Sequence, residues 1–589
     1  MGLLQQAVRT YDIMEKIGLV GKYEEGKKEP LAPVGHIIAN AKIEITIDRD
    51  GNFVSAQKVD KKIIIPVTEE SSGRTSAPAP HLICDKLDYL SGENEEKYKR
   101  FIEQLEFFES SEYSDKITSA VLKYLKKNHV INDLLLHGLI EINGNSVKNR
   151  DDLICWRVIG FKDESGYVFE GPILRKFEKY YCDRLANTAK DICFVTGEKE
   201  VSASQHMGGV APLHGKAKII STKDDGKFTY WGRFCEGKEA LTVGHITSQK
   251  AHNALKWLVA NQGFRIDSRY YICWNPQGKR IPGIQSPLLP NKEDKIIPKD
   301  YKKALQEVLL GYRKELNDQE DVIIASFDAA TTGRLSVGYY GELKGSDFLE
   351  RLEYWDMTCC WFDNRYGTSS PSLMSITRFA FGNQRGNDEA AKIEVDDRIQ
   401  NQQMYRLIKC RIEKARIPTD IVRAVVGRAG NLQIYNKGNR QKLLFTACAI
   451  INKYMFDYGR EAYEMSLETT KKDRSYQYGR LLAVLEKIEK DTYDREENRE
   501  TNAIRMQSVF VKRPAYATRI ILEQLKNGYY PKLSSGTRVY YDKLIGQIME
   551  VISEFEEDYN KSLAETYLLG YYLQKNDLYT KKTENEQED

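Results

Sequence analysis

The sequence has few of the features that mark secreted, membrane or zinc-binding proteins. Its 10 cysteines form no CxxC pair, and Cys359 and Cys360 are adjacent, so neither a zinc ribbon nor a disulfide framework is indicated. No apolar run approaches the ~18 residues needed to cross a bilayer, and no apolar stretch of signal-peptide length occurs near the N-terminus. We therefore expect reduced, mostly buried thiols, no membrane segment and a cytoplasmic location.

Catalytic motifs are also missing. All 8 histidines lie at or before His252, and none belongs to an HExxH motif, an HD pair or a recognisable Cys/His arrangement. Glu394, Asp396 and Asp397 cluster in a charged, loop-like stretch, where solvation is the usual explanation. Residues 21–28 approximate a phosphate-binding loop, but a helix precedes them and no Ser or Thr follows the lysine. We expect no catalytic residues, no metal site and no cofactor.

Net charge is low for a protein of this length. It is only +3 over 589 residues, which argues against a uniformly basic nucleic-acid binder, so any basic surface must be local. The length is sufficient for several domains, each with its own hydrophobic core. Charge therefore has to be considered segment by segment.

The order of the patterns predicts an α+β fold, with mixed structure and antiparallel sheets first and helices later. Ile43, Ile45 and Ile47 alternate with polar residues up to a turn at 48–51, which is typical of a hairpin, and 62–67 add a third strand. Further strand patterns occur at 153–160, 167–169, 322–327 and 334–340, and helical patterns follow to the C-terminus. We expect an N-terminal α+β lobe over 1–275, a linker or long surface loop over 276–302, a second α+β segment over 303–403, a basic helical segment over 404–464, a helix bundle over 465–580 and a disordered tail over 581–589.

A stretch near the middle of the chain predicts a bounded helix with a polar row. Thr247 or Ser248 can cap a helix whose apolar residues recur at three and four, and Gly263 suits a left-handed end, so one face should be buried. The opposite side carries amide and ammonium donors that a merely solvated face would not need. The candidate nucleic-acid contacts here are Gln249, Lys250, Asn253 and Lys256. An ordinary amphipathic surface helix is the alternative.

Two loops supply further candidate contacts. Glycine and two prolines forbid regular structure between residues 71 and 92, while Arg74, Ser76 and His81 place donors on one tethered loop. Between residues 208 and 218, three glycines free the backbone for close approach, and Lys216 and Lys218 alternate onto one face of a strand. A plain connector and a lysine-flanked solvent strand are the alternatives. Nearby cysteine and histidine residues lack zinc-like spacing.

The most basic window spans residues 404–442. It holds ten cations against two acidic residues, a local excess sufficient to attract phosphates in a chain that is otherwise near neutral. An interface with an acidic partner subunit is the alternative. The candidate DNA contacts in this window are Arg406, Lys409, Arg411, Lys414, Arg416, Arg423 and Arg428.

Several stretches together resemble one family. They are residues 244–263 with Trp231-Gly-Arg-Phe before them, the loop of 71–92, the Cys-Phe-Val-Thr-Gly-Glu segment at 193–198, and the end segments 476–486 and 567–574. These resemble the large subunit of the subtype I-C CRISPR surveillance complex (Cascade), an RNA-guided DNA-binding assembly.

The resemblance implies a non-catalytic subunit for antiviral defence. Its N-terminal lobe would recognise the protospacer-adjacent motif in double-stranded DNA and promote R-loop formation, while guide pairing supplies most sequence specificity. Its C-terminal bundle would stabilise the displaced non-target strand and resemble a small subunit, and an internal start at Met465 would produce this bundle separately. The implied partners are the crRNA-containing Cascade backbone, the crRNA-end-capping subunits, target double-stranded DNA and a helicase-nuclease effector. A scaffold that binds mainly protein partners, and a nuclease with an unrecognised site, are the alternatives.

Overall fold

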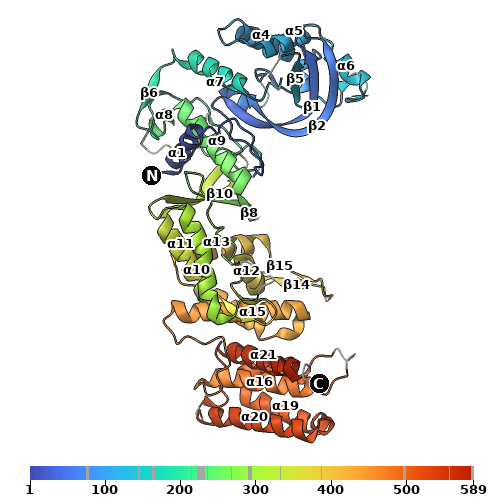
Figure 1. The fold of residues 1–589 in the computed structure, drawn as a ribbon, viewed down its shortest axis with the longest axis vertical. Coiled ribbons are helices and arrows are strands. Elements are labelled where there is room, and N and C mark those ends of the chain that lie inside the picture. The colour runs from blue at the N-terminus through green and yellow to red at the C-terminus, as the bar shows by residue number, and fades with distance from the viewer. Residues whose placement is uncertain are drawn as a thin grey trace. The chain divides into compact units, whose positions relative to one another are not determined.

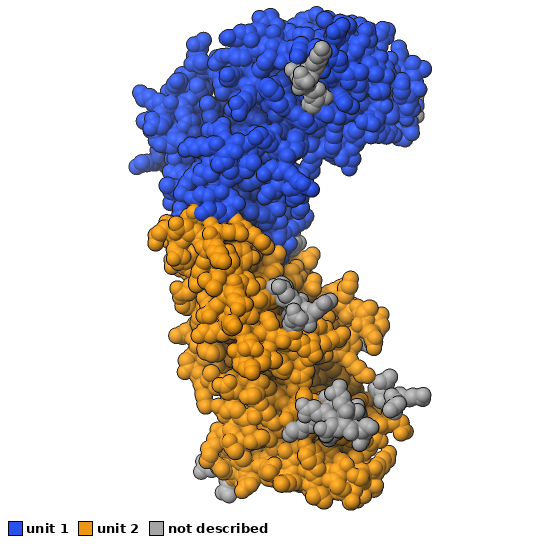
Figure 2. All heavy atoms as spheres, viewed as in Figure 1, with its two compact units in different colours: residues 1–279, 321–343 blue, residues 280–320, 344–589 orange. Residues whose placement is uncertain are grey.

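The computed structural model describes most of the chain, which divides into two compact units (Figure 2). Unit 1 comprises Met1–Lys279 with Asp321–Leu343, and unit 2 comprises Arg280–Glu320 with Lys344–Asp589. About 49% of the residues are helical and 17% lie in strands, so the predicted α+β class is confirmed. The described residues are 1–74, 78–143, 146–161, 166–213, 215–221, 233–234, 237–266, 268–289, 295–331, 333–386, 388–494, 499–555 and 558–585.

The first core of unit 1 is built on a long hairpin, β1 (His36–Asp48) and β2 (Phe53–Pro66), with β5 (Ile154–Ile159) parallel to β1. The predicted turn at residues 48–51 is confirmed: the Asp48 carboxylate accepts hydrogen bonds from the Asp50 and Asn52 amides. The separate third strand predicted at 62–67 is wrong, because β2 continues through it and pairs with the start of β1 beyond a register shift.

Helices cover this three-stranded sheet and fill its core (Figure 1). The apolar residues of α4 and α5 recur at helical spacing, so each helix buries one side, α5 against β1 and β5 and α4 against α3 and α5. The helices of this region are α2 (Glu69–Ser72), α3 (Leu87–Leu90), α4 (Glu95–Glu109), α5 (Lys116–Lys126), α6 (Val130–Leu136) and α7 (Pro172–Leu185). Two small hairpins lie nearby in the sequence, β3 (Ile142–Asn143) with β4 (Ser146–Val147), and β6 (Lys190–Ile192) with β7 (Lys199–Val201).

The second core of unit 1 packs two helices, α1 (Leu3–Lys16) and α9 (His245–Gln262), with a four-stranded sheet. The sheet has the order β11-β10-β9-β8, so the two strands predicted around residue 333 join two strands that directly follow α9. A short helix, α8 (Gly237–Ala240), precedes α9. The strands are β8 (Phe264–Ile266), β9 (Arg269–Trp274), β10 (Asp321–Thr331) and β11 (Arg334–Lys344).

The first part of unit 2 is mainly helical, with two short hairpins. Leu349, Leu352 and Trp355 of α11 are buried in its interior together with the apolar residues of α15. The helices are α10 (Pro298–Glu315), α11 (Gly345–Thr358), α12 (Leu373–Phe381), α13 (Asp397–Glu413), α14 (Thr419–Ala429), η1 (Leu432–Ile434) and α15 (Lys437–Asp457). The hairpins are β12 (Trp361–Asp363) with β13 (Gly367–Ser369), and β14 (Asn383–Arg385) with β15 (Lys392–Glu394).

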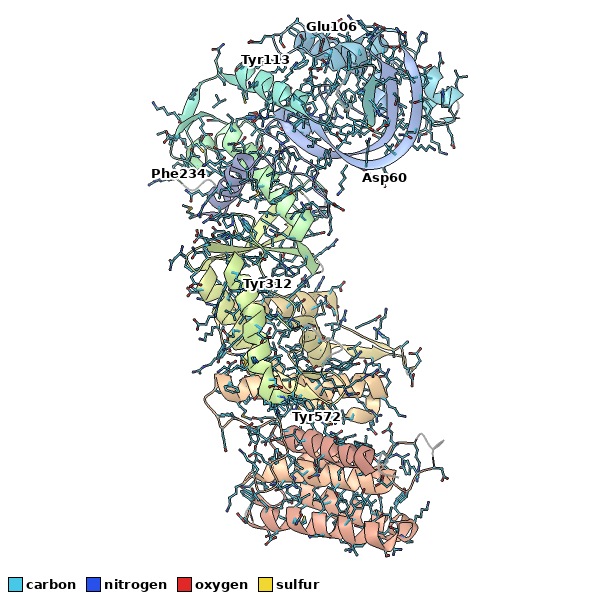
Figure 3. All side chains as sticks on the ribbon, in the orientation of Figure 1. Asp60, Glu106, Tyr113, Phe234, Tyr312 and Tyr572 are labelled. Atoms are coloured by element: carbon cyan, nitrogen blue, oxygen red, sulfur yellow. The ribbon has the colours of Figure 1, made fainter. Side chains whose placement is uncertain are left out.

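The C-terminal part of unit 2 contains the predicted bundle helices, with different ends. The backbones of α16 and α21 approach closely, since a Cβ on Gly479 would lie 1.9 Å from the Tyr567 carbonyl oxygen. Tyr572 of α21 donates a hydrogen bond to the Asp363 carboxylate at 2.9 Å (Figure 3). The helices are α16 (Arg474–Lys490), α17 (Asn502–Arg505), α18 (Gln507–Lys512), α19 (Pro514–Gly528), η2 (Tyr530–Lys532), α20 (Ser535–Ser553) and α21 (Tyr567–Asn585). α21 thus extends into the predicted tail, whose last residues, 586–589, lie outside the described residues.

Among the described residues, no helix combines the length and the apolar character that crossing a lipid bilayer requires.

Candidate nucleic-acid interface

The central helix, α9, forms where the sequence predicts it, but its ends are made differently. Neither Thr247 nor Ser248 is the N-cap; the helix begins after Gly244. The Glu200 carboxylate lies beside this end of the helix, because it accepts the Thr247 hydroxyl at 2.7 Å and stands where a Cβ on Gly244 would lie only 1.9 Å away. Gly263, at φ −69°, is extended and not left-handed. The glycine before the helix is therefore required by the approach of a carboxylate.

The polar row of α9 is buried, and the prediction of a helix with one buried face is wrong. Gln249 and Asn253 are each only 3% exposed. Gln249 Oε1 accepts the amide of Gly35 at 2.9 Å, and Asn253 Nδ2 lies 3.1–3.2 Å from the carbonyl oxygens of Ala32, Pro33 and His36. Both amides thus bind the chain segment that leads into β1, and they serve the fold within this chain.

The two lysines of α9 differ in their surroundings. Lys250 pairs with Asp12 at 2.7 Å and Glu15 at 3.2 Å, which joins α9 to α1. Lys256 is half-buried, and its ammonium lies 4.0 Å from the Met207 sulfur. Burial lowers the pKa of Lys256 to about 8, and the positive charge of Lys216 contributes to this shift. Lys256 is therefore the candidate on α9 whose charge is left uncompensated.

The polar loop after residue 71 is stabilised by its own predicted contact residues. The Arg74 guanidinium binds the buried carboxylate of Asp85 with both terminal nitrogens and stacks 4.4 Å from the centroid of Tyr89. His81 Nδ1 lies 3.0 Å from the Ser71 hydroxyl, and burial lowers the pKa of His81 to about 4, so the ring is neutral at pH 7. Ser76 lies outside the described residues. Arg74 and His81 thus shape the loop from within.

Buried histidines connect the segments around α9. His206 Nδ1 lies 2.8 Å from the Ser248 hydroxyl, and His245 Nδ1 lies 2.6 Å from a Glu69 carboxylate oxygen. His252 Nδ1 lies 2.7 Å from the Ser248 carbonyl oxygen, and burial lowers the pKa of His252 to about 3. In the part of the chain that the structure describes, no group of three or more His, Cys, Asp or Glu residues is placed to hold a metal ion. These contacts fix α2 and the 204–207 segment against the first turns of α9.

Three lysines gather where these segments meet, and we name Lys216, Lys218 and Lys256 the lysine cluster. The predicted strand at 216–218 is reduced to isolated bridges at Lys218, but Ala217 between the two lysines is buried, so both point away from the core. Gly208 permits the tight pairing, because a Cβ there would lie 2.2 Å from the Lys216 carbonyl oxygen. The Lys216 ammonium lies 3.4 Å from the Ser72 carbonyl oxygen at the end of α2.

The lysine cluster has a surplus of positive charge. Among the described residues, none of its three ammonium groups has a carboxylate within ion-pair distance. The pKa of Lys216 is lowered by partial burial and by the charges of Arg74, Lys86 and Lys218. Partial burial also lowers the pKa of Lys218, although Glu69 opposes this. Cations held together with depressed pKa values attract an anion, because a bound anion relieves both the repulsion and the lost hydration.

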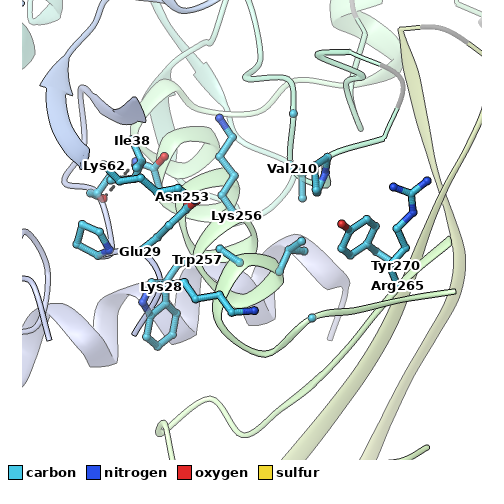
Figure 4. Close-up of a pocket in the computed structure, with 17 residues that line it drawn as sticks. Lys28, Glu29, Ile38, Lys62, Val210, Asn253, Lys256, Trp257, Arg265 and Tyr270 are labelled. Atoms are coloured by element: carbon cyan, nitrogen blue, oxygen red, sulfur yellow. Dashed lines mark hydrogen bonds and ion pairs between the residues drawn. The ribbon is translucent and has the colours of Figure 1, made fainter. Parts of the chain in front are cut away.

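A pocket of about 470 Å³ opens beside Lys256 (Figure 4), and we name it the Lys256 pocket. Asn253, Lys256 and Trp257 of α9 line it, while Arg265 and Tyr270 come from β8 and β9. Its remaining polar lining residues are Lys28, Glu29 and Lys62. The contribution of residues 28–36 was not predicted from the sequence. A signal was present in the amides at 249, 253 and 261, which recur every four or eight positions on one helical face and indicate a bound backbone segment.

Acidic residues neutralise Arg406, Arg411, Lys414 and Arg440 of the basic window, and three of these four partners come from elsewhere in the chain. Arg411 is 1% exposed and pairs with the fully buried Asp356 at 3.2 Å, so an exposed role for Arg411 is wrong. Arg406 binds Asp420 with two contacts of 2.6 Å. Lys414 lies 3.1 Å from Glu350. A count of charges within the window misses partners such as Asp356, which lies 55 positions away.

The other cations of the window fall into two groups. Arg428 binds the carbonyl oxygens of Ala380 and Gly382, which satisfies the C-terminal end of α12. Lys409, Arg416 and Arg423 have no acidic partner among the described residues, and the first two lie against the rings of Tyr405 and Tyr458. These three, unlike Arg406, Arg411 and Lys414, therefore keep a charge that no carboxylate of the described residues compensates, and unlike Arg428 they are not bound to backbone carbonyls at a helix end.

Comparison with known families agrees with the resemblance found in the sequence. A family model described as CRISPR-associated protein (Cas_Csd1) matches residues 19–579. No curated protein matches the chain. The matched region includes α9, the loop after α2, the lysine cluster and the basic window. Because the match covers nearly the whole chain, this protein belongs to the Cas_Csd1 family of CRISPR-associated proteins, the family of the type I-C large subunit.

Proposed function

We propose that this chain is the DNA-reading subunit of a type I-C guide complex, and that the lysine cluster holds the phosphates of the duplex that carries the protospacer-adjacent motif. In such complexes the guide supplies most of the sequence specificity, while protein reads a short motif and helps the duplex to open. The observation that carries the proposal is the convergence of three sequence-distant segments on Lys216, Lys218 and Lys256, whose charges are uncompensated. Phosphate contacts of this kind fix the register of a duplex.

In this proposal the helical unit 2 binds the displaced strand, while unit 1 binds the duplex. Lys409, Arg416 and Arg423 would attract the displaced non-target strand, and the neighbouring tyrosines offer rings on which bases can stack. The chain would act in the cytoplasm with the crRNA-containing backbone, the crRNA-end-capping subunits and a helicase-nuclease effector. We propose that it leaves cleavage to that effector, since the buried histidines His81, His206 and His252 are engaged in contacts that shape the fold.

The C-terminal helices also fit production as a separate small subunit. Met465 lies in the connection between α15 and α16, ahead of the Asp473 side chain that caps α16. A product that starts there would retain α16 together with α19, α20 and α21, each of which packs on α16. Silencing the Met465 start codon should remove a short product from expressing cells, as seen on a gel. Persistence of that product would contradict the internal start.

The double substitution Lys216→Met with Lys218→Met tests the central proposal. We expect target affinity of the guide complex to fall by roughly tenfold to a hundredfold at ~0.1 M salt, and the slope of log K against log salt to decrease by about 2, since each phosphate contact contributes about 0.9. The matched control is Lys99→Met with Lys123→Met, two exposed lysines on α4 and α5. An unchanged affinity and salt slope would overturn the proposal.

Labelled DNA incubated with the purified chain and magnesium or manganese tests the proposal that the chain has no nuclease activity of its own.

A further inference from the structure

The Lys256 pocket has one wall, residues 28–36, that is tied to α9 at both ends. Asn261 Oδ1 accepts the Lys28 amide at 2.6 Å, and Asn261 Nδ2 donates to the Glu29 carbonyl at 2.9 Å. At the other end Gln249 and Asn253 bind the residues that lead into β1. Because a single helix holds the whole segment, the pocket is formed before a ligand arrives, and little ordering cost remains for binding.

The lining of the pocket combines positive charge with aromatic rings. The Lys256 ammonium has no carboxylate partner among the described residues, and Lys28 is exposed and likewise lacks one there. Lys62 pairs with Glu29, the single acidic residue of the lining. Trp257 of α9 and Tyr270 of β9 stand on different walls (Figure 4). Such a lining suits a ligand that has both an anionic group and a planar ring.

The size and position of the pocket narrow the choice of ligand. A volume of about 470 Å³ lies within the range of small-molecule sites and is sufficient for one nucleotide, but not for a base pair with its two backbones. Lys256 belongs both to the lysine cluster and to the pocket lining, and Gly209 of the lining donates its amide to the carbonyl oxygen of Ala217, between Lys216 and Lys218, at 2.8 Å, so the pocket adjoins the lysine cluster. A DNA strand held by Lys216 and Lys218 can therefore continue to the pocket.

We infer that the Lys256 pocket holds a single unpaired nucleotide of the bound DNA, with its phosphate on Lys256 and Lys28 and its base against Trp257 or Tyr270. Holding one extruded nucleotide would stabilise the duplex in an opened form next to the motif, because an enclosed base cannot pair again. The inference rests on the proposed function, since the lysine cluster has to grip DNA first. Lys28 acts here as a point charge, and no phosphate-binding loop is involved.

The test uses the full chain in its guide complex, with duplex targets that carry 2-aminopurine at successive positions of either strand in and beside the motif. We expect a fluorescence change at one position of one strand when the complex binds. Lys256→Met should abolish that change and lower affinity at least roughly tenfold, and Lys28→Met should reduce both, whereas Lys256→Arg should retain them. Because Lys28 is exposed, its substitution keeps the test independent of folding. Lys99→Met is the matched control.

The outcomes separate the inference from the proposal on which it rests. If targets bind in a way that depends on Lys216 and Lys218 while no 2-aminopurine position responds to Lys256→Met, the inference is overturned and the proposed function stands. If the wild-type complex does not bind any target, both fail. A third arm titrates the wild type with a free nucleoside monophosphate. Binding of that nucleotide as tightly as the strand would overturn the assignment to DNA, and absence of such binding supports it.

Discussion

Positive charge is organised in opposite ways in the two units of the protein. In unit 1 only three lysines form the cluster, yet among the described residues none of them has a carboxylate within ion-pair distance. In unit 2 the basic window holds ten cations, but acidic residues such as Asp356, Glu350 and Glu500 from distant positions neutralise several of them. We therefore expect the lysine cluster, although it is the smaller group, to bind an anion more strongly.

The difference shows that pairing decides which cations are available, and that the number of cations does not. A guanidinium held by a buried carboxylate contributes to the fold and has no charge to offer a phosphate. An ammonium with a depressed pKa has the opposite character, since it costs stability until an anion arrives. Substitution of a paired, buried cation should therefore lower the stability of the protein. Substitution of an unpaired cation should instead lower its affinity for DNA.

Arg411→Met should destabilise the protein most. It would leave Asp356 buried without its partner, and breaking a buried ion pair costs about 3–5 kcal/mol. Urea unfolding followed by circular dichroism measures the free energy of unfolding. Arg423→Met, an exposed change on α14, is the control and should stay within about 0.5 kcal/mol. Normal stability of Arg411→Met together with weaker DNA binding would return Arg411 to the set of DNA contacts and break the comparison.

Lys256→Met should change the free energy of unfolding in the opposite direction and stabilise the protein. The pKa of Lys256 is lowered from 10.5 to about 8 in the folded state, so the unfolded state binds more protons between these two values. Near pH 7 the folded chain carries the full cost of the buried charge, and its removal should raise the free energy of unfolding by about 2–3 kcal/mol. The groups that act on this ammonium are Lys216 and Glu29.

The pH dependence sharpens this prediction. The advantage of Lys256→Met over the wild type should be largest below pH 8 and should shrink as pH rises from 8 towards 10.5, because the wild-type lysine then loses its proton on folding. Paired urea titrations at pH 7, 8.5 and 9.5 measure the difference. A destabilised variant at pH 7 would mean that Lys256 is a structural residue, and the lysine cluster would then resemble the basic window.

Asn253→Ala should cost about 1–3 kcal/mol of stability. Its amide binds backbone carbonyls of residues 32–36, and these acceptors would be left buried without a partner. Gln249→Ala should act in the same direction through the Gly35 amide. The measurement is the unfolding midpoint, with Gln262→Ala at the end of α9 as the control. Unchanged stability with reduced target affinity would instead support the direct DNA contact that the sequence alone predicts.

The parts of the fold that could be predicted are those that depend on neighbours in the sequence. The turn at 48–51 and the extent of α9 follow from local spacing and local hydrogen bonds. The division of β2 into two strands failed because its length is set by pairing with β1 across a register shift. The approach of Glu200 to the start of α9 could not be predicted either, since 44 positions separate that carboxylate from the glycine it approaches, Gly244.

The candidate site was predictable to a similar degree. The sequence singles out three segments as candidate contacts, around Ser71, Lys216 and Lys256, and the structure brings these segments together. It could not show that Gln249 and Asn253 face residues 32–36, because a helical wheel gives the direction of a side chain but not what covers it. It also could not show that Asp356 is the partner of Arg411. Both errors concern contacts between distant residues.

The smallest expected effect is that of three cations of the basic window that have no acidic partner among the described residues. The triple substitution Lys409→Met, Arg416→Met and Arg423→Met should lower target affinity by about tenfold or less, for every target sequence alike, and reduce the salt slope by about 2 if all three contact a single strand, at about 0.7 for each contact. Electrophoretic shifts of the guide complex at several salt concentrations measure both quantities. Lys299, Lys302 and Lys303, exposed on α10, supply a control triple with the same change in charge. If the window triple weakened binding more than the loss of Lys216 and Lys218, number of charges would outweigh pairing after all, and the contrast between the two units would lose its basis.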